Sequence, residues 1–276
     1  MKKHSGFTLV ELMIATVIGL FLMASLMNLF IATNRSVTLS DALAQNQEAG
    51  RFAMDYMTKF IRQAGYSEDF TVAAPPILIN TAATPCLADA CSDNNPVDAQ
   101  GDRLAIPYVA NDITEVRSCS GTVIGGPING QQQVANVFWV SNAAGTENEL
   151  RCRTFDYNNN VWIDAAPVSV VANVESFEFQ LGIAANEADR NVARYVNLET
   201  IENDPLLSLN NVRSIRIALL TTSLDELDAN KLKTNVTERK YSVLDGPTLT
   251  ITDGNLRQVF GNTIELPNMI ESATLN

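Results

Sequence analysis

The stretch GFTLVELMIATVIGLFLM, residues 6–23, decides the architecture of this chain. Its apolar side chains continue to about Ile31, which is long enough for a helix to cross the hydrocarbon core of a bilayer. Glu11 stands near the start of this apolar run, and a carboxylate is costly in a membrane. An acid at this position therefore needs a physical reason.

The helical pattern continues well beyond the apolar run. Apolar residues recur at three- and four-residue steps from Ala42 to Ala64, and charged residues occupy the other faces. No proline occurs between Phe7 and Gly65, and Gly65 is placed where a helix C-cap is expected. We therefore predict one continuous helix within residues 7–65, about 85 Å long, with a membrane half and an amphipathic half.

The remaining residues, 66–276, read as a β-rich globular domain. Residues 198–209 look helical or irregular, and alternation is clearest where Phe177, Phe179 and Leu181 oppose Glu178 and Gln180. This pattern predicts an α+β fold in which the long helix packs on an antiparallel sheet with one buried face. The expected strands are 104–109, 113–117, 134–140, 149–155, 168–171, 174–181, 212–221 and 257–266.

Composition and charge exclude several classes of function. The net charge is −12, with no basic block, which argues against nucleic acid as a partner. His4 is the only histidine, so histidine-activated nucleophiles and the commonest zinc ligand are missing from the body. The sequence has no phosphate-binding glycine loop and no HExxH motif. We therefore expect a protein that is not an enzyme and needs no cofactor.

The cysteines are four in number, which suggests two disulfides in an exported domain. Sequence alone permits three pairings. Cys86 and Cys91 close the short loop CLADAC, which leaves Cys119 and Cys152 for the second bridge. A four-thiolate zinc site is the alternative, but structural zinc sites favour closer pairs than these.

An acidic segment, DACSDNNPVDAQGD, offers the other candidate for metal binding. Its carboxylates are Asp89, Asp93, Asp98 and Asp102, and they lack the ligand spacing of a calcium loop. We interpret the segment as a solvated acidic loop and expect no metal site in the chain.

The flanks of the apolar run predict its orientation. Lys2 and Lys3 precede it, so the N-terminus is expected on the cytoplasmic side and the body outside the membrane. The run is too long for the apolar core of an ordinary cleaved secretory signal. These features describe a single-pass anchor.

The segment GFTLVELMIATVIGL resembles the class III signal of type IV pilins and pseudopilins, with its leader glycine, aromatic residue, Thr-Leu pair and glutamate. In that family a prepilin peptidase cuts after the glycine and methylates the new amine. The resemblance implies that residues 1–6 are the leader, that Gly6 precedes the cut, and that Phe7 becomes the methylated first residue. Glu11 matches the glutamate of the family.

Further segments resemble the PilW-like minor pilins: QNQEAGRFAMDYMTKFIRQAGY, GDRLAIPY, SCSG with LRC, and VRSIRIALLTTS. The resemblance implies a minor pilin that helps initiate type IV pilus assembly within a tip or priming complex. Its implied partners are the prepilin peptidase, other minor pilins, the major pilin, a large tip adhesin and the inner membrane. The implied location is the inner membrane with a periplasmic domain, then the pilus tip of a Gram-negative bacterium.

The acid at the helix start has two physical explanations. A cut at Gly6 creates an amine on Phe7, and a buried amine and carboxylate are tolerable when paired. In a bundle of such helices, Glu11 meets the amine of a neighbouring subunit. The alternative is an acid that only complements the macrodipole of its own helix. We favour the pairing, because the dipole does not offset burial in a membrane.

Two other functions fit part of this pattern. A J-type pseudopilin of a type II secretion system has the same helix and glutamate. A membrane-anchored periplasmic binding domain, with a signal-like start by coincidence, belongs to a different class. The mature N-terminus separates the last alternative from the others.

Overall fold

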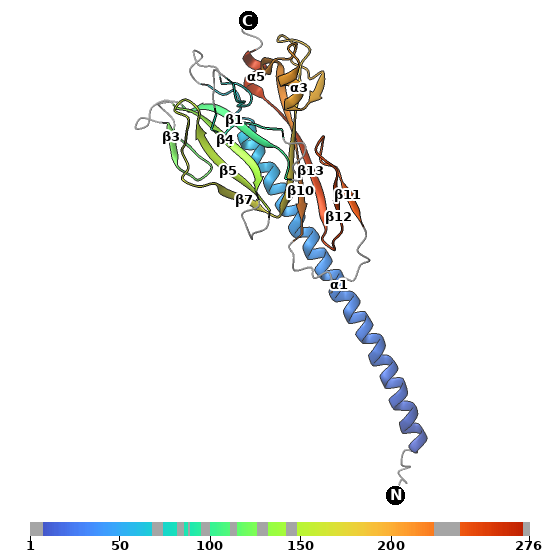
Figure 1. Ribbon diagram of the computed structural model, residues 1–276. Coiled ribbons are helices and arrows are strands. Elements are labelled where there is room, and N and C mark those ends of the chain that lie inside the picture. The colour runs from blue at the N-terminus through green and yellow to red at the C-terminus, as the bar shows by residue number, and fades with distance from the viewer. Residues whose placement is uncertain are drawn as a thin grey trace.

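The computed structural model describes residues 8–67, 74–81, 86–87, 89–94, 100–110, 115–125, 132–141, 148–223 and 238–272. A single long helix, α1 (Leu9–Ile61), projects from one end of a β-rich body (Figure 1). Its 53 residues correspond to a length of about 80 Å. The expected α+β arrangement, a long helix packed on antiparallel sheet, is confirmed.

The body contains two main antiparallel sheets among the described residues, where we expected one. Sheet A is ordered β1-β4-β5-β6, with β7 also paired to β5, and sheet B is ordered β13-β10-β8-β9. The strands of sheet A are β1 (Arg103–Ala110), β4 (Gln132–Ser141), β5 (Glu149–Asp156), β6 (Val161–Trp162) and β7 (Val168–Ala172). The strands of sheet B are β8 (Val174–Ile183), β9 (Arg194–Val196), β10 (Val212–Thr222) and β13 (Arg257–Glu265).

Small elements complete the body. Two hairpins pair β2 with β3 and β11 with β12. The sequence pattern indicated only β2 of these four, because strands of three residues carry almost no periodic signal. The remaining elements are β2 (Glu115–Arg117), β3 (Val123–Gly125), α3 (Leu198–Asn203), the 3₁₀ turn η1 (Leu209–Asn211), β11 (Arg239–Tyr241), β12 (Leu249–Ile251) and α5 (Pro267–Ser272).

The core lies between the two sheets and the body-facing half of α1. Phe138 of sheet A, Phe177 and Ile217 of sheet B, and Met57 and Ile61 of α1 belong to one buried cluster. The helix thus fills the space that two sheets leave open between them. This burial, rather than intrinsic helix propensity, stabilises the C-terminal half of α1.

Sheet B is covered on both faces, which the alternation in the sequence did not predict. Ala218 and Leu220 of β10 pack under Val243 and the hairpin β11–β12. Glu178, expected on an open face, is only 1 % exposed. The β11–β12 hairpin covers that face of sheet B. The alternation within a strand cannot predict such a cover, because the hairpin is distant in sequence.

The helix ends earlier than its pattern suggested. Its last residue is Ile61 and its C-cap is Arg62, whereas the prediction ran to Ala64. Residues 62–65 form a turn that finishes at Gly65, whose φ is 73°. Glycine adopts this left-handed conformation without a steric penalty, so the chain reverses there toward the body.

Candidate assembly site on the N-terminal helix

The first turn of α1 is closed by a capping box between Thr8 and Glu11. Glu11 Oε2 accepts hydrogen bonds from the Thr8 backbone N–H and from Thr8 Oγ1, each at 2.9 Å. Thr8 Oγ1 accepts in turn from the Glu11 backbone N–H at 3.3 Å. This reciprocal arrangement satisfies two backbone donors at the helix start.

The other oxygen of this carboxylate is available. Glu11 Oε1 makes no hydrogen bond with any residue that the structure describes. The carboxylate therefore caps its own helix through one oxygen and leaves the second for a donor from elsewhere. Gly6 and Phe7, the predicted cleavage and methylation residues, lie outside the described residues.

The N-terminal half of α1 is exposed along its whole length. Every residue from Thr8 to Thr38 is exposed, and Glu11 is the one charged residue between Thr8 and Asn34. Within the described part of the chain, α1 is the one helix long and apolar enough to cross a membrane. An apolar surface of this extent requires lipid or other helices to cover it.

Hydroxyl side chains in this apolar half are satisfied within the helix. Thr16 donates to the Met13 carbonyl at 2.9 Å, and Thr33 donates to the Leu29 carbonyl at the same distance. Such bonds let polar residues lie in hydrocarbon without an external partner. Glu11 differs from them, because one of its oxygens lacks such a bond.

The C-terminal half of α1 is tied to sheet B by polar contacts as well as by packing. Thr221 Oγ1 donates to Asn46 Oδ1, and Asn262 Nδ2 donates to Thr58 Oγ1 at 3.2 Å. Just after the helix, Asn268 Nδ2 of α5 donates to the Ala64 carbonyl in the turn at 3.0 Å. The exposed half of the helix therefore projects from a fixed base.

The buried stripe of α1 differs in part from the expected one. Ala42, Ala53, Met57, Ile61 and Ala64 are buried as the spacing predicted. Phe52 belonged to the expected stripe but is 54 % exposed. Asn46, Gly50 and Met54 are buried in its stead, because the sheets contact a face rotated from the one that the aromatic residues mark.

The cysteines form two disulfides in the structure, Cys86–Cys91 and Cys119–Cys152. The Cα atoms of each pair lie 5.8 Å apart, within the range of a bridge. The second bridge joins the turn after β2 to the central strand β5. The described residues contain no cluster of three or more side chains that could hold a metal ion.

The interpretation of the acidic segment as a solvated loop is partly wrong. Asp89 and Asp93 do lie at the surface, where both pair with Arg103 at 3.3 and 3.4 Å. Asp102, however, is only 2 % exposed, and its Oδ2 accepts from the Phe179 backbone N–H at 3.0 Å. Asp98 lies outside the described residues.

Asp102 meets a second buried acid that sequence reasoning missed. Burial, and then the adjacent Asp102 carboxylate, raise the pKa of Glu178 to about 9, so Glu178 is neutral at pH 7. Glu178 Oε1 is buried and makes no hydrogen bond with a described residue. No pattern in the sequence signals this pair, because Asp102 lies just before β1 and Glu178 lies on β8, far apart along the chain.

Two family models match the chain. The model described as the prokaryotic N-terminal methylation motif matches residues 1–27, which include Thr8 and Glu11. The model described as Type IV Pilus-assembly protein W matches residues 137–268, from the middle of β4 to the start of α5. No curated protein and no solved structure matches the chain.

Proposed function

We propose, from the premise that the chain is a PilW-like minor pilin with a class III prepilin signal, that it helps to initiate type IV pilus assembly. It would do so in a tip or priming complex with other minor pilins. Its role is that of a structural subunit, in agreement with the two family matches. The exposed apolar helix and the prepilin motif indicate a membrane-anchored pilin.

The observation that carries the proposal is the state of Glu11. Its carboxylate stands at the start of an exposed apolar helix and uses one oxygen to cap that helix. An amine from a neighbouring subunit would occupy the other oxygen and form a charge-assisted hydrogen bond. In hydrocarbon such a pair has one favourable position along the helix, so it would fix the register of neighbouring subunits.

The same proposal includes maturation of the chain. Prepilin peptidase would cut after Gly6, on the cytoplasmic side, and methylate the amine of Phe7. The body, residues 66–276, would face the periplasm before the subunit enters the filament. The major pilin, other minor pilins and a large tip adhesin would then be its neighbours.

Complementation of a deletion strain tests the function. We expect loss of surface pili on deletion, recovery with the full chain, and no recovery with Glu11→Ala, although that variant is still cleaved. Mass spectrometry of the purified chain should show methylated Phe7 as the first residue. A different mature N-terminus, or normal piliation by Glu11→Ala, would refute the assignment.

A J-type pseudopilin is the alternative that this experiment also addresses. Both functions require the same cleavage and the same helix, so the mature N-terminus does not separate them. Loss of protein secretion with unchanged pili would favour the pseudopilin. Co-purification with other minor pilins would favour the pilus.

A further inference from the structure

Strand β13 forms a free edge of sheet B, because it pairs only with β10 among the described strands. The Leu266 N–H donates to the Arg213 carbonyl, in register with the β10–β13 ladder. Antiparallel ladders alternate, so residues 264 and 262 also direct their backbone groups to β10. The backbone groups of Gly261, Thr263 and Glu265 therefore point away from the sheet.

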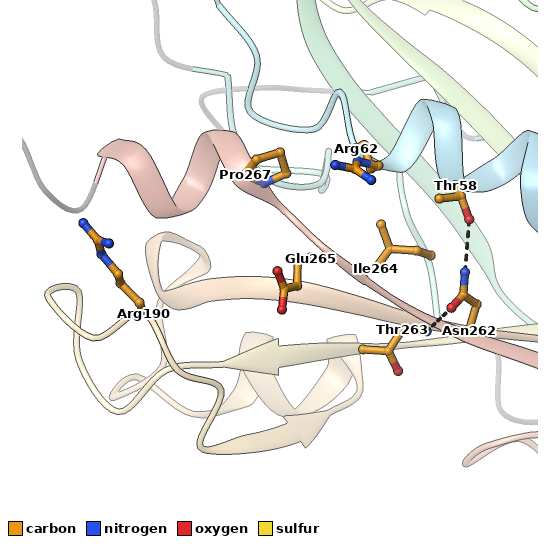
Figure 2. Close-up of a pocket in the computed structure, with 8 residues that line it drawn as sticks. All are labelled: Thr58, Arg62, Arg190, Asn262, Thr263, Ile264, Glu265 and Pro267. Carbon is orange, nitrogen blue, oxygen red and sulfur yellow. Dashed lines mark hydrogen bonds between the residues drawn. The ribbon is translucent and has the colours of Figure 1, made fainter.

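The hydrogen bonds of Asn262 agree with this direction. Asn262 Oδ1 accepts from the Thr263 N–H at 2.9 Å, so this N–H is outside the ladder (Figure 2). Asn262 Nδ2 is held by Thr58 of α1 at the same time. The side-chain amide thus occupies the place that a carbonyl of an added strand would take.

A cavity of about 550 Å³ lies along this edge. Four consecutive β13 residues, 262–265, line it together with Thr58 and Arg62 of α1, Arg190 and Pro267. Consecutive strand residues point to opposite faces, so a single cavity touches all four only at the edge of the strand. The edge is therefore exposed along these residues, and an added strand would displace the Asn262 side chain only at the Thr263 N–H.

Two arginines flank the open edge. Figure 2 shows Arg62 at the end of α1 and Arg190 on the loop after β8, with Glu265 on the strand between them. Neither guanidinium has a hydrogen bond or ion pair with a described residue. The lining has a net positive charge, although the chain as a whole carries −12.

The loop that carries Arg190 is held in place by a buried side chain. Arg213 is 1 % exposed, and its guanidinium donates to the Glu187 carbonyl at 2.6 Å and the Asp189 carbonyl at 2.9 Å. Asn186 Oδ1 accepts from the Ala188 and Asp189 N–H groups in the same loop. Arg190 follows directly after this fixed turn, so its backbone position is set before any ligand arrives.

We propose that the edge of β13 between Gly261 and Glu265 accepts an extended acidic segment of another protein as an additional strand. The backbone groups of the edge would supply the ladder, and Arg62 and Arg190 would bind carboxylates on the two faces of the added strand. The partner is thus an extended peptide segment with one acid at an odd and one at an even position, so that a carboxylate lies on each face of the added strand. This inference goes beyond the assembly role and does not depend on it.

A tethered strand tests the proposal without knowledge of the natural partner. The detergent-solubilised full chain is extended after Asn276 with a flexible Gly-Ser linker and the sequence TVEVTEVT, whose two glutamates lie on opposite faces of a strand. The linker raises the effective concentration of the segment. We expect a higher Tm than for the linker alone. We also expect amide exchange at Gly261 and Glu265 to slow by about tenfold or more.

Matched controls separate strand addition from simple charge attraction. Lysine in place of glutamate in the extension should abolish the protection, and so should proline at every second position, because it removes backbone donors. Arg62→Ala and Arg190→Ala should each weaken the effect. Arg51→Ala, on the same helix but outside the cavity, should not.

Each contrary outcome overturns the inference. Equal protection by the lysine extension would show that the arginines do not bind carboxylates of the added strand. Equal protection by the proline extension would show that no backbone hydrogen-bond ladder forms. No protection with the acidic extension would show that the edge of β13 does not bind an added strand. The outcome for pilus assembly is separate, because these measurements need only the purified chain.

Discussion

Glu178 and Asp102 place two buried carboxyl groups together where the sheets meet. The Gly101–Phe177 bridge joins the two sheets beside them. Glu178 also touches the β11–β12 turn, where a Cβ on Gly246 would lie 2.2 Å from Glu178 Oε1. Asp164 is equally buried, but Ser118, Ser120 and Thr154 all donate to it. A buried carboxylate is therefore tolerated where hydrogen-bond donors surround it. Glu178 differs from Asp164 because its Oε1 has no such donor among the described residues.

The pKa of Glu178 predicts a pH dependence of stability. In the folded chain this group keeps its proton up to about pH 9, whereas in the unfolded chain it loses the proton near its ordinary pKa of 4.5. Between these two pH values only the folded state binds this proton. The contribution of Glu178 to the free energy of unfolding therefore falls as the pH rises from the lower value to the higher one. The neutral amide of Glu178→Gln avoids this loss. Its Tm relative to wild type should rise from pH 5 to pH 8.

The groups that face Glu178 define the controls for this measurement. Asp102 and Asp245 are the charges that raise its pKa, and Phe179 holds Asp102 through its N–H. Glu199→Gln changes an exposed acid on α3, and the difference between its Tm and that of wild type should be the same at every pH. A constant offset between Glu178→Gln and wild type from pH 5 to pH 8 would contradict the assignment.

At the scale of elements, Gly50 marks a close approach of α1 to the body. A Cβ at this position would lie 2.3 Å from the ring of Phe260 on β13. Glycine within a helix is less favourable than alanine by about 1 kcal/mol, so this position favours close packing over helix propensity. The spacing of apolar residues did not mark Gly50, because a residue without a side chain carries no hydrophobic signal.

We therefore expect Gly50→Ala to destabilise the chain despite its better helix propensity. The added methyl forces the Phe260 ring to move, and such overpacking costs about 1–3 kcal/mol. In the double variant Gly50→Ala with Phe260→Ala, the methyl should be tolerated. Denaturant unfolding of the four members of this cycle measures the coupling. Additive effects would show that the two residues do not oppose each other.

The two disulfides should contribute unequally to stability. Cys119–Cys152 closes a loop with a sequence separation of 33, and Cys86–Cys91 closes one of 5. Loop-closure entropy gives about 4 kcal/mol for the first and about 2 kcal/mol for the second. Serine replacement of each pair, followed by urea unfolding, tests the order. Equal losses, or a free thiol at Cys119 in non-reducing peptide mapping, would contradict this account.

For the whole molecule, the sequence predicted what has a local or periodic signal. The long helix and eight of the strands follow from spacing, and the membrane half follows from length and composition. The division into two sheets did not follow, because it depends on which strands pair at long range. The buried Glu178, the arginine-flanked edge of β13 and the second cover of sheet B arise from such pairings and have no local signal.

The role of Glu11 is a property of the assembled filament, and two substitutions separate it from helix capping. If Glu11 acts only as a cap for its own chain, Thr8→Ala should impair incorporation at least as much as Glu11→Gln, since Thr8→Ala removes the hydroxyl of the capping box whereas glutamine can still close it. If Glu11 binds an amine of a neighbouring subunit, Glu11→Gln removes the charge and incorporation is lost. Thr8→Ala would then leave the carboxylate free to bind, and incorporation should persist. Immunoblots of sheared pili against the membrane fraction measure this, with mass spectrometry confirming equal cleavage of both variants. We expect the second pattern, and equal defects would assign Glu11 to the cap.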